Sequence, residues 1–183
     1  MAFIIVGCST HPKESEVIAP ATHKSQSSAA GIETQQVALE QNAEFVIELV
    51  FHKREVVLSQ ENKNKLQKMM KTALQKEHVD KIKVISWADE EYPSEKVKKL
   101  SSEQRQIADD RNKAIKTYIQ DGKNDLKIDV YSMAERANSL KEFLGSSEVR
   151  IKDSLEHSGI PTSDDPSHFA SKASKSIVMF IMK

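Results

Sequence analysis

From residue 44 onward, the apolar positions of the chain follow two alternating periods. Residues 44–51 carry an apolar side chain at every second position, which is typical of a β-strand with one buried face. Three more short apolar stretches, at residues 80–87, 126–131 and 175–182, have the length and composition of strands. The pattern therefore predicts four strands.

Between these strands, the apolar residues recur at helical spacing. The first helix begins after Ser59, a favourable N-cap residue, and its apolar stripe comprises Leu66, Met69, Met70, Ala73 and Leu74. The second helix covers residues 103–120, and its stripe comprises Ile107, Ala114, Ile115, Tyr118 and Ile119. A third helix is expected to start at Asn138 or Ser139 and to end by Gly159. Residues 90–99 are polar and predict a solvated loop or an early helical turn.

The resulting order of elements is β-α-β-α-β-α-β within residues 43–183. Strands that alternate with helices need crossover connections, so at least part of the sheet is expected to be parallel. The predicted fold class is α+β: a two-layer sandwich in which the helices cover one face of a four-stranded mixed sheet.

Residues 9–42 differ in character from the rest of the chain. They are rich in Ser, Thr, Ala, Gln, Glu, Lys and His, and their apolar residues follow no period. Such a segment cannot bury enough apolar surface to offset its ordering entropy. We expect a flexible tether with an r.m.s. span of about 30 Å. It would hold the domain away from a membrane surface or order against a partner protein.

The first eight residues form a short apolar run that ends in Cys8. The sequence Ile5-Val6-Gly7-Cys8 resembles a bacterial lipobox, in which lipid is attached to the cysteine. The run is shorter than the roughly 7–15 residues of a signal-peptide core and lacks a basic start, so an upstream signal is expected to be missing. On this interpretation residues 1–8 are a signal remnant, and Ser9 favours sorting to the outer membrane. The alternative is an N-terminal strand with a buried free cysteine.

Composition argues against several classes of function. The 27 basic and 27 acidic residues balance, and aromatic residues make up only 5%, so nucleic-acid binding is not expected. The single cysteine rules out an internal disulfide or a cysteine-based metal cluster. No glycine-rich phosphate loop, metal-ligand spacing or nucleophile motif is present. We therefore expect no cofactor, no metal and no enzymatic activity.

Two charged residues are the strongest candidates for a functional site. Arg111 lies one turn after Ile107 and one turn before Ile115, so it falls on the apolar stripe of its helix. A buried guanidinium needs an anion, and Asp89, at the end of the preceding strand, is placed to supply one. A zwitterionic ligand would engage both charges at once. The alternative is an internal salt bridge that fixes strand to helix.

Residues 43–183 resemble the OmpA-like, peptidoglycan-associating domain. The family's Gly-Tyr-Thr-Asp strand end corresponds to Ser86-Trp87-Ala88-Asp89, which keeps the aspartate. Its Asn-x-x-Leu-Ser-x-x-Arg-Ala helix corresponds to Gln104-x-x-Ile107-Ala108-x-x-Arg111-Asn112, which keeps the arginine. Its closing Asn-Arg-Arg-Val corresponds to the degenerate Ser174-Lys175-Ser176-Ile177. The layout is also similar to that of OmpA-like lipoproteins of the Dot/Icm type IVB secretion system.

This resemblance implies that Asp89 accepts from the ammonium of meso-diaminopimelate in the peptidoglycan stem peptide. Arg111 would hold the ligand carboxylate. Arg111 is expected to lie in the first turns of its helix, where the positive end of the helix dipole adds modestly to anion attraction. Gln104, Trp87 and Lys175 would complete the pocket.

The function implied is that of a non-catalytic lipoprotein on the periplasmic face of the outer membrane. It would anchor an envelope complex to the cell wall. The alternative is a structural docking subunit of a type IV secretion core complex that has lost peptidoglycan binding.

Overall fold

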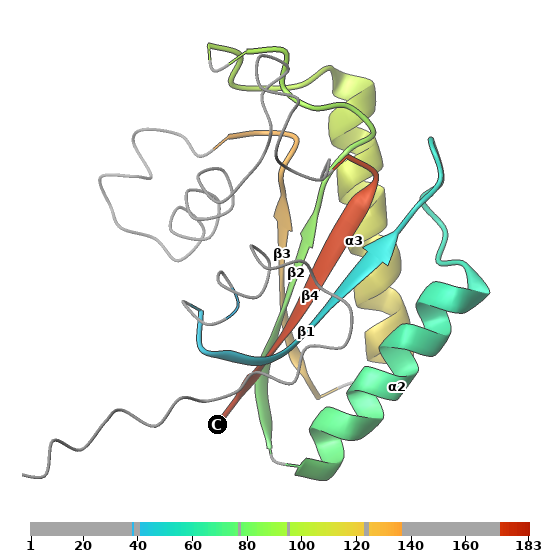
Figure 1. Ribbon diagram of the computed structural model, residues 1–183, viewed down its shortest axis with the longest axis vertical. Coiled ribbons are helices and arrows are strands. Elements are labelled where there is room, and N and C mark those ends of the chain that lie inside the picture. Colours follow the sequence, from blue (N-terminus) through green and yellow to red (C-terminus); the bar gives the residue numbers. More distant parts are fainter. Residues whose placement is uncertain (1–37, 39–40, 77, 95, 123–124, 137–172) are drawn as a thin grey trace, which may run out of the picture.

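In the part of the chain that the computed structural model describes, six elements form the domain (Figure 1). The structure describes residues 38, 41–76, 78–94, 96–122, 125–136 and 173–183. The elements are β1 (Ala43–Val50), α2 (Gln60–Lys76), β2 (Val79–Ser86), α3 (Ser102–Gly122), β3 (Lys127–Ser132) and β4 (Lys175–Met182). Each strand lies within one residue of its predicted position. The predicted third helix, the lipobox and residues 9–37 and 39–40 of the tether fall outside the described residues. At the end of the tether, Ala38 is buried and the Gln41 side chain accepts from Lys83 at 2.9 Å, so these two residues pack against the domain.

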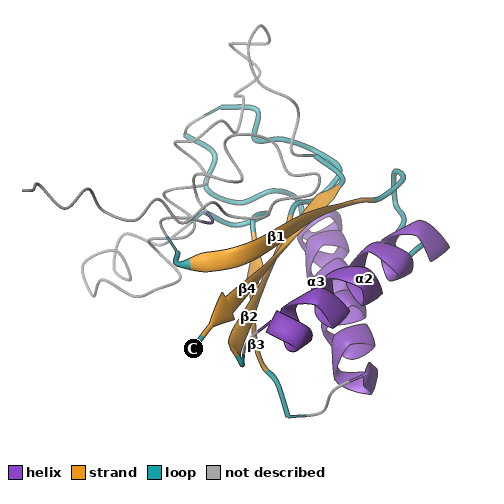
Figure 2. Cartoon of the chain, turned by 60° about the horizontal axis from the view of Figure 1, so that its bottom comes forward, coloured by secondary structure: helices purple, strands orange, loops and turns teal. Residues whose placement is uncertain are grey.

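The four strands form one mixed sheet in the order β1-β4-β2-β3. β4, the last strand in the chain, pairs antiparallel with both β1 and β2, whereas β3 pairs parallel with β2. Figure 2 shows α2 and α3 on the same face of this sheet. The predicted two-layer α+β sandwich with a mixed sheet is therefore confirmed.

The main core lies between the helices and the sheet, and local signals in the sequence position α2 over it. The Ser59 hydroxyl accepts from the backbone N–H of Asn62 at 3.2 Å, as expected of an N-cap. The buried Asn62 side chain then donates to the carbonyl of Val50 at 2.8 Å and ties the helix to the end of β1. The predicted stripe residues Leu66, Met69, Met70 and Ala73 are buried in this core, whereas Leu74, the fifth predicted residue, is exposed.

The opposite face of the sheet is also apolar. A second cluster of buried side chains lies there, comprising Ala38, Ala43, Val46, Ile85, Trp87, Tyr131, Met133, Ile177 and Met179. Alternate residues of β4 contribute to the two clusters, because Val178 and Phe180 belong to the main core. This double burial explains why residues 175–182 are almost continuously apolar.

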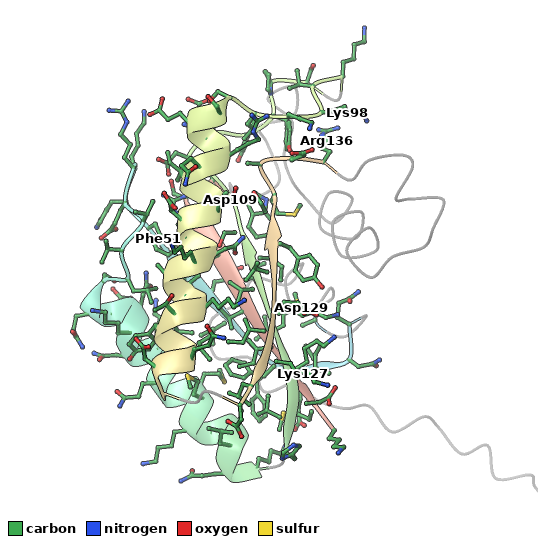
Figure 3. All side chains as sticks on the ribbon, turned by 180° about the vertical axis from the view of Figure 1, so that it is seen from behind. Phe51, Lys98, Asp109, Lys127, Asp129 and Arg136 are labelled. Carbon is green, nitrogen blue, oxygen red and sulfur yellow. The ribbon has the colours of Figure 1, made fainter. Side chains whose placement is uncertain are left out.

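A small extension continues beyond the ends of β2 and β3. The backbone of Leu100 donates to Ala134 at 2.9 Å, and Arg136 donates to Lys98 at 2.9 Å, so that Lys98 and Arg136 lie together at one end of the molecule (Figure 3). Tyr92 is buried there and donates its hydroxyl to Met133 at 3.1 Å. The described residues of the polar stretch 90–99 thus form a loop, one of the two predicted alternatives, but the loop is not fully solvated because Tyr92 is buried.

In the part of the chain that the structure describes, no helix combines the length and the apolar character needed to cross a membrane.

Candidate functional site

The Arg111 guanidinium lies at the centre of the candidate site and is fully buried. Its Nη2 lies 2.6 Å from Asp89 Oδ1 and donates to the carbonyl of His52 at 3.2 Å. Its Nη1 donates to the carbonyl of Trp87 and its Nε to that of Glu55, both at 2.9 Å. Four of the five N–H groups of an arginine are thereby bound by protein oxygens. A single buried charge therefore connects α3, the end of β2 and the segment after β1.

Asp89, whose side chain is 1% exposed, is held equally tightly. Besides Arg111, it accepts from the Ser174 hydroxyl at 2.7 Å and from the backbone N–H of Arg54 at 2.5 Å. Burial by itself raises the pKa of the Asp89 carboxyl. The hydrogen bonds from Ser174, Arg54 and Arg111, together with the charge of Arg111, outweigh burial and leave this pKa below its ordinary value. The carboxylate is thus ionised at neutral pH.

Gln104 fixes the position of Asp89 from the first turn of α3. Its side-chain oxygen accepts from the Asp89 backbone N–H at 2.9 Å. Its own backbone N–H donates to the Ser101 hydroxyl at 3.3 Å, in the arrangement of an N-cap. The start of α3 and the end of β2 are thereby joined through the residue that the sequence had placed near the site.

A tight turn, His52 to Glu55, covers the charged pair. The backbone N–H of Glu55 donates to the carbonyl of His52 at 2.9 Å, and the Glu55 carboxylate accepts from the His52 backbone N–H at 2.9 Å. Just before the turn, the Phe51 ring lies 4.8 Å from the Arg111 guanidinium carbon, within the range of a cation–π contact. Figure 3 shows Phe51 next to α3. The turn and this ring shield the pair from solvent.

Backbone strain gathers at the Asp89 carboxylate. In the described ranges, three residues other than glycine have a positive φ: Asn42, Arg54 and Ser174. Two of them, Arg54 with φ 64° and Ser174 with φ 59°, donate directly to Asp89. Left-handed backbone is unfavourable for side chains with a Cβ and is found preferentially at ligand clamps and switch regions. This coincidence marks Asp89 as a candidate for function.

The other two predicted pocket residues lie elsewhere. The Trp87 ring belongs to the apolar cluster on the sheet face opposite the helices, so only its carbonyl reaches Arg111. Lys175 lies two residues before Ile177 in β4, so its side chain lies on the same sheet face as Ile177, opposite the helices. There its Nζ lies 3.9 Å from Glu48 Oε2. The structure thus brings together Asp89, Arg111 and Gln104, but not the Trp87 ring or the Lys175 ammonium.

The expectation that the positive end of the helix dipole strengthens anion binding at Arg111 is wrong. Arg111 lies nine residues after Ser102, the first residue of α3, and the dipole effect is confined to the terminal turn. Asp109 is exposed on this helix, and Asp110 accepts from Gln106 at 2.9 Å. The anion that Arg111 requires is supplied by Asp89 instead.

Sequence reasoning missed the turn and Ser174. The turn contacts the charged pair through backbone atoms of His52, Arg54 and Glu55. Every residue type carries such atoms, so the sequence gives no signal for these contacts. Arg54 even contradicts the usual signal, because a turn of this shape favours glycine at that position. Ser174 stood in the degenerate closing motif, and its hydroxyl was the only available signal.

Chemically, the site offers an ionised carboxylate beside a guanidinium, which suits recognition of a ligand with both charges. No group of three or more histidine, cysteine, aspartate or glutamate side chains is arranged to hold a metal ion within the described ranges.

Two solved structures are similar to this chain. No protein-family model matches the chain, and no curated protein matches it. The chain is similar to the OmpA-like domain of FopA1 from Francisella tularensis subsp. tularensis SCHU S4, with 8% identity, a TM-score of 0.41, and coverage of 73% of this chain and 70% of that chain. It is also similar to the periplasmic domain of Helicobacter pylori MotB, with 16% identity, a TM-score of 0.41, and coverage of 75% of this chain and 76% of that chain. At these values, neither likeness carries an argument about ligands or partners.

Proposed function

We propose that this chain contains an OmpA-like, non-catalytic domain of the bacterial cell envelope that associates with peptidoglycan. The observation that carries the proposal is the contact of Asp89 with Arg111 at 2.6 Å, at a strand end where strained backbone gathers. Asp89 would accept from the ammonium of meso-diaminopimelate, and Arg111 would donate to the adjacent carboxylate. Charge-assisted bonds of this kind are roughly twice as strong as neutral ones.

The neighbouring residues have supporting roles in this proposal. Gln104 is a positioning residue, because it holds the Asp89 backbone without facing the ligand. Trp87 orients Arg111 through its carbonyl and not through its ring. Lys175 lies on the other sheet face, next to Glu48, and is left out of the ligand contacts.

Binding is favoured over catalysis by the charge state of the pair. General acid–base catalysis needs a group whose pKa lies near the operating pH. The pKa of Asp89 is lowered away from that range. The site would therefore hold a charged ligand and transfer no proton.

The N-terminal part of the proposal rests on the sequence. Lipid on Cys8 would hold the chain at the periplasmic face of the outer membrane, and residues 9–42 would let the domain reach the wall. Two linked weak attachments raise the effective concentration of each for its target. The lipid anchor and the wall-binding domain together would thus clamp an envelope complex to the wall.

Sedimentation of the full chain with two kinds of peptidoglycan tests the proposal without altering the protein. One wall preparation carries meso-diaminopimelate in its stem peptides, and the other carries L-lysine, which lacks the second carboxylate. Retention on the first and not on the second is expected, because only the first presents a zwitterionic end to Asp89 and Arg111. Equal retention on both would show that Asp89 and Arg111 do not recognise the zwitterionic end of diaminopimelate.

A second candidate function is a docking subunit of a type IV secretion core complex that has lost peptidoglycan binding. It is favoured by one observation: the Arg111 and Asp89 side chains are 0% and 1% exposed and are already bound by the protein's own groups. On this alternative the pair is an internal salt bridge. The folded chain would then sediment with neither wall preparation.

A further inference from the structure

The His52–Glu55 turn presents ligand-like groups to the charged pair. The backbone N–H of Arg54 donates to Asp89 Oδ2 at 2.5 Å, where a ligand ammonium would donate. The carbonyls of His52 and Glu55 accept from Arg111 at 3.2 and 2.9 Å, where a ligand carboxylate would accept. The turn therefore supplies a donor to Asp89 and acceptors to Arg111, as the ammonium and carboxylate of a zwitterion would.

The cover that this turn provides is thin. Its residues His52, Lys53 and Arg54 are exposed, although their backbone lies against a buried pair. The turn is anchored by Phe51, which donates to Ser174 at 2.8 Å, and by the buried Leu58. Displacement of a few backbone groups between these anchors would free the atoms of Asp89 and Arg111 that the turn binds, while the Phe51 ring stays over the guanidinium.

The turn is also strained in its docked form. Arg54 has φ 64° at the third position of a turn in which Lys53 has no positive φ, the arrangement of a type II turn that favours glycine. In the part of the chain that the structure describes, its side chain forms only an exposed ion pair with Glu103, at 3.5 Å, and exposed pairs contribute little. Apart from the turn's own hydrogen bonds between His52 and Glu55, the contacts with Asp89 and Arg111 hold Arg54 in this conformation.

We propose that the His52–Glu55 turn is an internal mimic of the ligand and competes with it for Asp89 and Arg111. This inference rests on the proposed function. The ligand replaces one donor and two acceptors supplied by the turn, while the bonds from Ser174 and to Trp87 remain. The apparent affinity is then the intrinsic affinity reduced by the fraction of molecules in which the turn is open.

Arg54 allows the equilibrium to be shifted in both directions. Arg54→Gly removes the strain of the left-handed residue and favours the docked turn. Arg54→Pro removes the N–H that binds Asp89 and fixes φ near −65°, so the turn cannot dock. Lys53→Gly is the matched control, because it adds the same backbone freedom at a position without positive φ.

The three variants and the wild type are compared as full chains in two measurements. The first is sedimentation with diaminopimelate-type peptidoglycan, after circular dichroism has shown that each variant is folded. The second is hydrogen exchange of the residue-54 amide, which reports opening of the turn in every protein except the proline variant.

The expected order of retention is Arg54→Pro above wild type, and wild type above Arg54→Gly by roughly threefold or more. Lys53→Gly is expected to bind at least as well as the wild type. The residue-54 amide should exchange more slowly in Arg54→Gly than in Lys53→Gly.

Two outcomes would overturn the inference, and they are distinguishable. If all four proteins are retained equally, the turn does not compete with the ligand, and the proposed function stands. If none is retained, including folded Arg54→Pro, the ligand itself is absent and the proposed function fails with the inference.

Discussion

Arg111 on α3 and Asp89 after β2 form a buried ion pair whose Nη2 and Oδ1 atoms lie 2.6 Å apart. Hydrogen bonds from the His52–Glu55 turn and from Ser174 converge on it. The pair therefore joins the helix layer to one end of the sheet. Any ligand that uses these charges must bind at a structurally essential point.

Removal of one partner is expected to destabilise the fold strongly. Arg111→Ala leaves the buried Asp89 carboxylate without its counter-charge, which costs about 3–5 kcal/mol in the free energy of unfolding. Urea denaturation followed by circular dichroism measures this difference.

The matched control for Arg111→Ala is Lys81→Ala. Lys81 also forms an ion pair, 3.1 Å from Asp129, but both side chains are more than one third exposed. Its loss is expected to cost less than about 1 kcal/mol. If the two substitutions cost the same, the central role of the Arg111 pair in stability is refuted.

Stability should depend on pH through Asp89. The folded pKa of Asp89 lies below its ordinary value of 3.8, so its ionised form contributes stability above that value. The contribution is lost as pH falls below 3.8 and through the folded pKa. The difference in unfolding free energy between wild type and Asp89→Asn should be constant above about pH 5 and shrink in more acidic solution.

Urea denaturation at pH values from neutral to acidic measures this dependence in both proteins. The pKa of Glu61 is also lowered, because Glu61 forms a hydrogen bond with Lys65 and lies near its charge. Glu61 is present in both proteins, so its contribution cancels in the difference. A difference that stays the same down to the most acidic conditions would show that Asp89 gains nothing from being ionised.

The junction between α2 and β1 depends on one amide. Asn62→Ala removes the side chain that donates to the Val50 carbonyl and is expected to cost about 1–3 kcal/mol. Asn64→Ala, two residues later on the same helix, alters an exposed side chain bonded only to Gln60 among the described contacts. Thermal unfolding of both variants should show a clear loss for Asn62→Ala alone.

Much of the fold was accessible from the sequence because the signals agreed. Alternation in β1, the Ser59 cap and the helical stripe around Ile107 and Ile115 each specify an element and the face that it buries. Placement of Arg111 on that stripe predicted its burial directly. These features depend on residue type at short range, which a sequence displays.

The rest depended on contacts that a sequence does not display. Closure of the pair by the His52–Glu55 turn uses backbone atoms, and the positive φ of Arg54 runs against its residue type. The positions of the Trp87 ring and Lys175 depend on which face each strand residue takes, and a sheet that is apolar on both faces gives no alternation to decide this.

The most direct test of the central claim is nuclear magnetic resonance titration of the full chain with meso-diaminopimelate, and in parallel with Nα-acetyl-L-lysine amide, whose blocked α-groups leave only the side-chain ammonium. The resonances to follow are the Arg111 Nε–H and the Arg54 backbone N–H, which lie at the charged pair. We predict saturable shifts of both signals with meso-diaminopimelate and none with the blocked lysine. Unchanged signals at millimolar meso-diaminopimelate, or equal shifts with the blocked lysine, would contradict recognition by Asp89 and Arg111.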